Sequence, residues 1–267
     1  MTDKLDVAFV HKTGAELTLS VLGSFRFRAG DTAPALPSGS QRLLALLALR
    51  DRSVTRLMIA GTLWPDSTEQ HASASLRSAL TRLRGGARDA VDVADLDLNL
   101  ASGVVVDIRD SKRFVHQLLE PNAPNLAPEA TAAAVASLSA DLLPDWYEDW
   151  VLIETEEWRQ LRLHALEAMA ANLAAAGRWA EAIGAAQAAI RGEPLRETSH
   201  AALIRVFLAE GNQTEAIGQF ERYKTLLNTE LNLEPTERIS DLVTNLGRRK
   251  TDPKTDPKTD PKRALTG

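Results

Sequence analysis

A short pattern in the second half of the chain recurs at a fixed interval and restricts the fold of that half. Residues 177–183 read GRWAEAI and residues 211–217 read GNQTEAI, so Gly, Glu, Ala and Ile each recur 34 residues later. A period of this length is typical of helical hairpins that stack side by side and bury a shared core. The sequence therefore predicts an all-α domain in this half.

The two copies match a tetratricopeptide repeat, whose period is 34 residues, to different degrees. In the first copy Ala170 and Ala182 are small where two helices must approach closely, and Pro194 follows at the expected distance. In the second copy Ile204 and Tyr223 stand where small residues are expected. Its last helix is therefore expected to run longer and to cap the array. Three tryptophans at helical spacing are expected to complete the core: Trp146, Trp150 and Trp158.

The first half contains the one strongly basic stretch of the chain, between Ser40 and Arg88. It holds eight arginines, no lysine and three acidic residues, a net charge of +5 in a chain whose net charge is −5. A local cluster of cations in an acidic protein is the pattern expected of a nucleic-acid-binding face, because phosphates attract localised positive charge.

Three short helices are predicted within this stretch. The first covers Gln41–Arg50 and is apolar on almost all sides, and the second covers Arg56–Leu63 with Thr55 as its cap. The third is expected from Thr68 to Arg84, opened by Ser67 and stopped by Gly85-Gly86. One stripe of this helix is apolar: Ala72, Leu76, Leu80 and Leu83. The neighbouring stripe is polar and cationic: Ser73, Arg77, Thr81, Arg84 and Arg88.

An apolar anchor beside a face of arginines and hydroxyls is what a DNA recognition helix needs. The residues expected to read bases are Arg77, Ser78, Thr81 and Arg84. Those expected to contact phosphates are Arg42, Arg52, Arg56, Arg82 and Arg88. For Arg82 the competing role is a surface ion pair with an acidic neighbour, and for the helix as a whole it is a solvated arginine face.

The flanks of the three helices favour a role in DNA binding. Residues 17–22 and 25–28 read as a strand pair turned by Gly23-Ser24, and residues 91–93 and 96–100 read as a second hairpin. A sheet, three helices and a hairpin, in that order, form a winged helix-turn-helix. The second hairpin carries Asp92, Asp95 and Asp97 and no cation, so it is expected to stand clear of the duplex or to face a protein.

Five segments of the first half follow the pattern of a known family: LTLSVLGSFRFRAG, QRLLALLALR, VTRLMIAGTLWPD, ASLRSALTRLR and VVVDIRDSKRF. They resemble the DNA-binding domain of the SARP family, the Streptomyces antibiotic regulatory protein type of transcriptional regulator. In the second half, residues 142–162 and 194–235 resemble the bacterial transcriptional activator domain of that family. The resemblance covers roughly residues 17–246. It implies a DNA-binding activator that binds repeated promoter sites as two protomers, with RNA polymerase as a further partner.

The domain map follows from composition. Residues 1–16 form an N-terminal extension, residues 17–119 the winged helix, residues 120–128 a proline-rich linker, and residues 129–247 the activator domain. Pro128 could instead open the Ala-rich helix that follows. Residues 248–267 contain TDPK three times and are expected to form a disordered tail, with contacts to DNA or polymerase as the less favoured role.

The composition argues against several classes of protein. Cysteine is absent, so disulfides and thiolate metal sites are excluded, and no apolar run has the roughly 20 residues of a membrane span. The five histidines lack metal-ligand spacing, and no phosphate loop or nucleophile elbow occurs. The acidic residues between Asp145 and Glu157 are interpreted as a charged helix surface. We therefore expect a cytoplasmic protein that is not an enzyme and uses no metal or cofactor.

Two functional hypotheses remain. The first is a sequence-specific transcriptional regulator that reads promoter DNA with its third helix and contacts proteins through its repeats. The second is a tetratricopeptide-type scaffold whose DNA-binding domain has lost tight binding, as the acidic hairpin would allow. The cluster of arginines on the third helix favours the first hypothesis.

Overall fold

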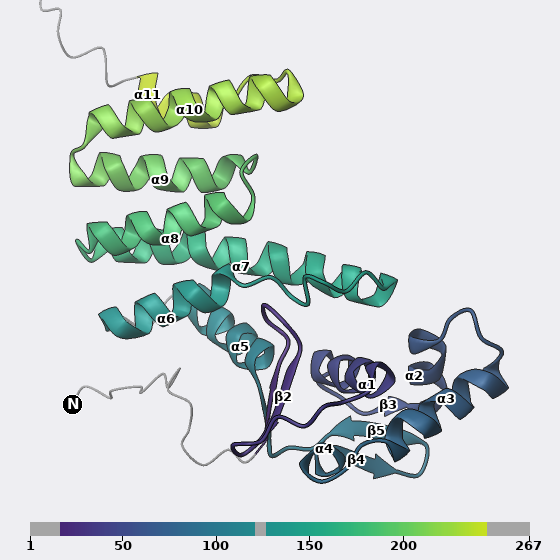
Figure 1. The fold of residues 1–267 in the computed structure, drawn as a ribbon. Helices are drawn as coiled ribbons and strands as arrows, with labels where there is room; N and C mark the ends of the chain where they lie inside the picture. Colours follow the sequence, from purple (N-terminus) through teal and green to yellow (C-terminus); the bar gives the residue numbers. More distant parts are fainter. Residues whose placement is uncertain (1–16, 121–126, 245–267) are drawn as a thin grey trace, which may run out of the picture.

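The computed structural model describes residues 17–120 and 127–244. The chain is mostly helical, with small sheets in its N-terminal part and a stack of antiparallel helices in its C-terminal part (Figure 1). The N-terminal extension, the centre of the linker and the TDPK tail lie outside the described residues. Among the helices that are described, none combines the length and apolarity of a membrane span.

Two three-stranded sheets frame the N-terminal part. In the first, β1 (Leu17–Ser20) lies between β2 (Arg26–Ala29), which is antiparallel to it, and β6 (Val104–Val106), which is parallel to it. In the second, β5 (Asp97–Leu100) pairs antiparallel with both β3 (Val54–Thr55) and β4 (Val91–Ala94). Both predicted hairpins are confirmed, whereas the short strands β3 and β6 were not predicted.

Three helices of the N-terminal part pack on one another. The first, α1 (Ser38–Leu49), buries every residue from Leu43 to Leu49. The second, α2 (Arg56–Leu63), has the predicted bounds, and the Thr55 side chain caps it by accepting a hydrogen bond from the Met58 N–H (3.3 Å). The third, α3 (Glu69–Thr81), packs on both.

The predicted bounds of the third helix were wrong at both ends. Its N-cap is Thr68, whose hydroxyl accepts from the His71 N–H, and not Ser67. The helix ends at Thr81, and the chain then turns so that Leu83 is buried. The glycine pair opens another short helix, α4 (Gly86–Asp89). There a Cβ on Gly86 would lie 2.5 Å from the Cβ of Ala29, so the close approach of α4 to β2 requires glycine.

Two helices connect the N-terminal part to the stack. The first of them, α5 (Asp107–Leu119), packs mainly on α7 (Asp149–Ala175) of the stack, and α6 (Pro128–Ser139) follows it. Pro128 lies in the first turn of α6, where its missing N–H costs nothing, so the alternative interpretation of this proline is confirmed.

The C-terminal stack consists of two long hairpins and a terminal helix. The first hairpin is α7 (Asp149–Ala175) with α8 (Trp179–Gly192), the second is α9 (Glu197–Glu210) with α10 (Gln213–Leu231), and α11 (Glu237–Thr244) follows. Gly177 and Gly211, at equivalent places in the repeat, both have positive φ values, 72° and 92°, and turn the chain between the helices of a hairpin. The 34-residue period therefore coincides with one helical hairpin.

Packing inside the stack follows the repeat where the residues agree. Ala170, Ala182 and Ala216 are fully buried at closely packed positions. The bulky Tyr223 is accommodated on α10, where its ring stacks on His200 with 4.3 Å between centroids. The helix extends to Leu231, as expected from the departing second copy. Trp158 is also fully buried, and its indole N–H donates to the Ala140 carbonyl (3.0 Å).

The N-terminal sheet and the stack are joined through the backbone. Leu22 forms an isolated antiparallel bridge with Leu142, and the Leu143 N–H donates to the Val21 carbonyl (2.9 Å). On its other side this segment is held by Asp107, whose carboxylate accepts from the N–H groups of Val21 (3.0 Å) and Leu22 (3.2 Å). Burial raises the pKa of Asp107, and these backbone donors oppose the shift.

Aromatic rings extend this junction. Phe25, which follows the bridge, stacks on Trp146 with a centroid distance of 5.8 Å, and Trp146 meets Trp150 edge to face at 6.3 Å. Trp150 is buried and Trp146 is partly buried. Aromatic pairs in these arrangements add about 0.5 to 1.5 kcal/mol beyond the area that they bury.

Ion pairs complete the junction and correct one expectation. Glu154 on α7 is 6% exposed, and its carboxylate lies 2.6 Å from Arg50 and 3.9 Å from Lys112. Glu148 lies 2.9 Å from the Nε atom of Arg42 on α1. The acidic residues of this region were predicted to form a charged helix surface, which is wrong for Glu154 because α1 and α5 cover it.

The buried ion pair predicts unequal effects for two glutamates of one helix. Glu154→Gln removes the charge that Arg50 and Lys112 share in a partly buried site, so we expect the free energy of unfolding to fall by about 1 to 3 kcal/mol. Glu157→Gln is the matched control, because Glu157 is exposed and forms no ion pair among the described residues, and it should cost no more than about 0.5 kcal/mol. Urea unfolding of the three proteins measures both changes, and equal losses would contradict the role given to Glu154.

The two helical hairpins predict opposite effects for two glycine substitutions. Gly211→Ala forces a Cβ into a left-handed conformation and should destabilise the protein by about 1 to 2 kcal/mol. Gly184 lies inside α8 with open space around it, so Gly184→Ala should stabilise the protein by about 0.5 to 1 kcal/mol. Thermal unfolding measures both, and a stabilised Gly211→Ala protein would contradict the cap assignment.

Candidate nucleic-acid interface

One side of α3 is anchored in the N-terminal core. Ala72, Leu76 and Ala79 are buried against α1 and α2. The buried Ser40 hydroxyl donates to the Ala79 carbonyl (2.8 Å), which ties the beginning of α1 to the last turns of α3. The orientation of α3 therefore depends on α1, which the junction with the stack holds in place.

The opposite side of α3 is exposed and carries three of the predicted base-reading residues: Arg77, Ser78 and Thr81. The Thr81 hydroxyl donates to the Arg77 carbonyl (2.8 Å), so its oxygen still has a lone pair to accept a bond from a ligand. Figure 1 shows α3 and the β4–β5 hairpin on the side of the N-terminal part that faces away from the stacked helices. No other part of the described chain covers this face.

Two further arginines follow the end of the helix. Arg82 is the C-cap residue of α3, and Arg84 lies in the connection to α4. Both are exposed, but neither continues the stripe of Arg77 and Thr81, because the helix ends before them. Within the described ranges, no carboxylate forms an ion pair with Arg77, Arg82 or Arg84.

Arg52 and Arg56 lie near the beginning of α2. Arg52 is exposed in the turn before β3. Arg56 opens α2, its backbone N–H donates to the Leu96 carbonyl (2.7 Å), and its Nε donates to the Asp95 carbonyl (3.1 Å). The tip of the β4–β5 hairpin is therefore fixed beside the first turn of α2, and the terminal nitrogens of Arg56 stay available.

Arg42 and Arg88, also predicted to contact phosphates, are engaged within the protein. Arg42 pairs with Glu148, donates to the Leu63 carbonyl (2.5 Å) and lies 6.0 Å from the centre of the Trp64 ring. Arg88 lies on α4 and donates to the Val91 carbonyl (3.0 Å). The structure thus brings five of the predicted arginines to accessible positions around α2 and α3 and gives these two internal partners.

The hairpin beside α2 has an apolar surface that the sequence reasoning missed. Leu57 and Met58 on α2 are more than half exposed, and Val93 and Leu96 project from the hairpin, Leu96 with 74% of its surface exposed. The hydrogen bond from Arg56 to Leu96 brings the two groups together. The sequence signal was the outward position of Leu96 in the hairpin turn, beside the three aspartates already noted.

The described residues contain no group of three or more His, Cys, Asp or Glu side chains placed to hold a metal ion. The outward face of α3 carries guanidinium and hydroxyl groups, which bind anionic oxygens and base edges.

Comparisons with known proteins agree on the kind of protein to which this chain belongs. Residues 106–246 match the family model of the bacterial transcriptional activator domain, so the matched region begins at β6 and includes α5. The regulatory protein AfsR of Streptomyces griseus is 26% identical over 248 residues, and that of Streptomyces coelicolor is 26% identical over 243 residues. The alignments cover 86% and 85% of this chain, which spans about a quarter (24%) of the length of each relative.

A solved structure supports the fold over both parts of the chain. Mycobacterium tuberculosis EmbR in complex with low affinity phosphopeptide superimposes with a TM-score of 0.60 and 23% identity, over 85% of this chain and 64% of that one. The family model and the relatives thus point to a regulatory protein. The chain belongs to the SARP-type family of transcriptional regulators, which carry a bacterial transcriptional activator domain.

Proposed function

We propose that this chain is a sequence-specific DNA-binding transcriptional activator whose N-terminal part is a winged helix-turn-helix domain. In this proposal α2 and α3 are the helix pair, α3 is the recognition helix, and β4–β5 is the wing. The observation that carries it is the outward face of α3, where Arg77 has no acidic partner among the described residues and stands beside Ser78 and Thr81. Arginine and hydroxyl side chains are suited to base edges in the major groove.

The surrounding arginines have a different role in this proposal. Arg52 and Arg56 flank the beginning of α2, where positive partial charge from the helix dipole adds to their attraction for phosphate. Arg82 and Arg84 follow the end of α3 and are better placed for the backbone than for base edges, because they leave the helix axis. Arg42 and Arg88 contribute to the fold.

The acidic wing is proposed to contact protein rather than DNA. Asp92 and Asp95 are exposed and would be repelled by phosphates, whereas Val93 and Leu96 offer an apolar surface. The activator domain that the sequence predicts over residues 129–247 is proposed as the second interaction domain. RNA polymerase and a second copy on repeated sites are the expected partners of such an activator, which would act in the cytoplasm where promoters are.

Selection of duplexes from a random DNA pool at near-physiological salt tests this function. An enriched sequence whose affinity falls steeply with salt is the expected result, because each arginine that neutralises a phosphate releases counterions. Weak binding that salt abolishes equally for all sequences would instead favour the scaffold hypothesis.

Two arginine substitutions separate base reading from phosphate contact. Arg77→Ala should weaken binding of the selected duplex by about 1 to 3 kcal/mol and relax the preference for one base at one position of the site. Arg56→Ala should weaken the binding of all duplexes alike. It should also lower the slope of log affinity against log salt concentration by about one. Arg191→Ala, an exposed arginine on α8, is the control for loss of charge. Fluorescence anisotropy with selected and scrambled duplexes measures these effects, and uniform loss by Arg77→Ala would refute its role in base reading.

A further inference from the structure

The stack contains a pocket at a distance from the proposed DNA-binding face. It has a volume of about 510 Å³ and is lined by residues of α7, α9 and α11. These are the helices that open successive units of the stack, so the pocket is a groove across their shared surface. Figure 1 places α9 and α11 at the end of the molecule away from α3.

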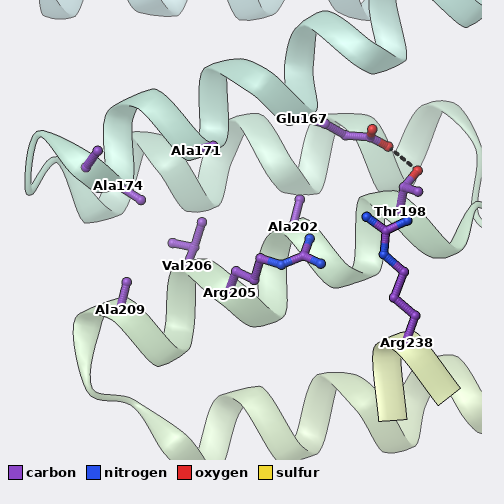
Figure 2. Close-up of a pocket in the computed structure, with 10 residues that line it drawn as sticks. Glu167, Ala171, Ala174, Thr198, Ala202, Arg205, Val206, Ala209 and Arg238 are labelled. Carbon is purple, nitrogen blue, oxygen red and sulfur yellow. Dashed lines mark hydrogen bonds between the residues drawn. The ribbon is translucent and has the colours of Figure 1, made fainter. Parts of the chain in front are cut away.

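The floor of this groove is built almost entirely from small side chains. Five alanines and one valine line it: Ala171, Ala174, Ala175, Ala202, Val206 and Ala209. Figure 2 shows Ala171 and Ala174 on one side of the groove and Ala202, Val206 and Ala209 on the other, with Arg205 beside them. A floor of methyl groups lets the main chain of a bound segment approach closely and offers an apolar surface to its side chains.

Two arginines stand at the open side of the groove without an acidic partner. Arg205 extends from α9 and Arg238 from α11 to the same side of the pocket (Figure 2), and both are exposed. In the part of the chain that the structure describes, neither forms an ion pair or a hydrogen bond. Two like charges in one pocket repel each other, and an anionic ligand would relieve that repulsion.

The one carboxylate in the lining is already engaged. Glu167 accepts hydrogen bonds from Arg196 (2.8 Å), Thr198 (2.7 Å) and Ser199 (2.8 Å). Burial opposes its ionisation, but these three donors prevail and hold its pKa below the usual range. Because Glu167 is paired with Arg196, it does not neutralise Arg205 and Arg238, and the groove retains a positive charge.

We infer that this groove binds an extended acidic peptide segment of a partner protein, with its carboxylates on Arg205 and Arg238 and its small apolar side chains on the alanine floor. The inference rests on the proposed function in assigning protein contacts to the stack, and it identifies the surface and the chemistry of the partner. The volume suits a few residues of peptide, since it falls within the 300 to 1,000 Å³ typical of ligand pockets.

The chain's own tail is a poor occupant on grounds of charge. Residues 245–267 contain seven Lys and Arg residues against three Asp residues, so this segment would be repelled by Arg205 and Arg238. A ligand supplied by another protein, with the opposite charge, fits the groove better.

Panning of a random octapeptide library on the full-length chain tests the inference. We expect enrichment of peptides that combine Asp or Glu with small apolar residues, and a synthetic copy of the best peptide should bind more weakly as salt rises. Arg205→Glu and Arg238→Glu should each lower its affinity at least ten-fold. Ala202→Phe, which fills the floor without changing charge, should do the same.

The controls separate a local loss from unfolding and from the DNA-binding proposal. Arg191→Glu should leave peptide affinity unchanged, and all variants should keep the unfolding midpoint of the parent protein and its affinity for the selected duplex. No enrichment, enrichment of neutral or basic peptides such as TDPK, or acidic-peptide binding that survives Arg205→Glu would overturn the inference. Peptide binding without specific DNA binding would instead refute the proposed function and leave the inference standing.

Discussion

The position of the candidate recognition helix depends on one buried carboxylate. Glu154, at the covered side of α7, lies between Arg50 from the end of α1 and Lys112 from α5. A buried carboxylate without these cations would be expensive, so its burial requires that α1, α5 and α7 stay together. Since Ser40 ties α1 to α3, the same requirement extends to the outward face of α3. The backbone bridge between Leu22 and Leu142 and the stack of Phe25 on Trp146 strengthen this junction with contacts that do not depend on charge.

Arginines that look alike in the sequence serve two purposes in the fold. Arg42 and Arg50 turn toward the acidic beginning of α7, where they offset the negative charge of Glu148 and Glu154. Arg77, on the far side of the same helical core, has no such partner among the described residues. The N-terminal part is therefore bound to an acidic surface on one side and presents unneutralised cations on the other. Such a division lets an acidic protein keep a local attraction for phosphate, because screening confines each charge to a range of about 10 Å.

The stack repeats this arrangement on a smaller scale. Glu167 is held by Arg196 and two hydroxyls, whereas Arg205 and Arg238 remain without a carboxylate beside an apolar floor. The proposed DNA-binding face and the proposed peptide groove lie in different parts of the chain, and the junction connects them through packed helices. If both proposals hold, the two faces would let the chain bind DNA and a protein partner at the same time.

The local pattern of the sequence was sufficient to predict most helices and strands. It was not sufficient to predict which arginines have partners inside the protein. Helix α2 and its Thr55 cap, both hairpins and the 34-residue hairpin period followed from residues close together in the chain, since caps, alternation and repeats are local signals. The end of α3 was missed because Gly85-Gly86 was interpreted as the stop of this helix. Gly86 instead permits the close approach of α4 to β2, a contact between distant segments. In the same way the sequence determined how many arginines the first half carries. Only the tertiary structure decided that Arg42 pairs with Glu148 and Arg88 bonds the Val91 carbonyl while Arg77 is left without a carboxylate among the described residues, because ion pairing depends on which segment lies opposite each side chain.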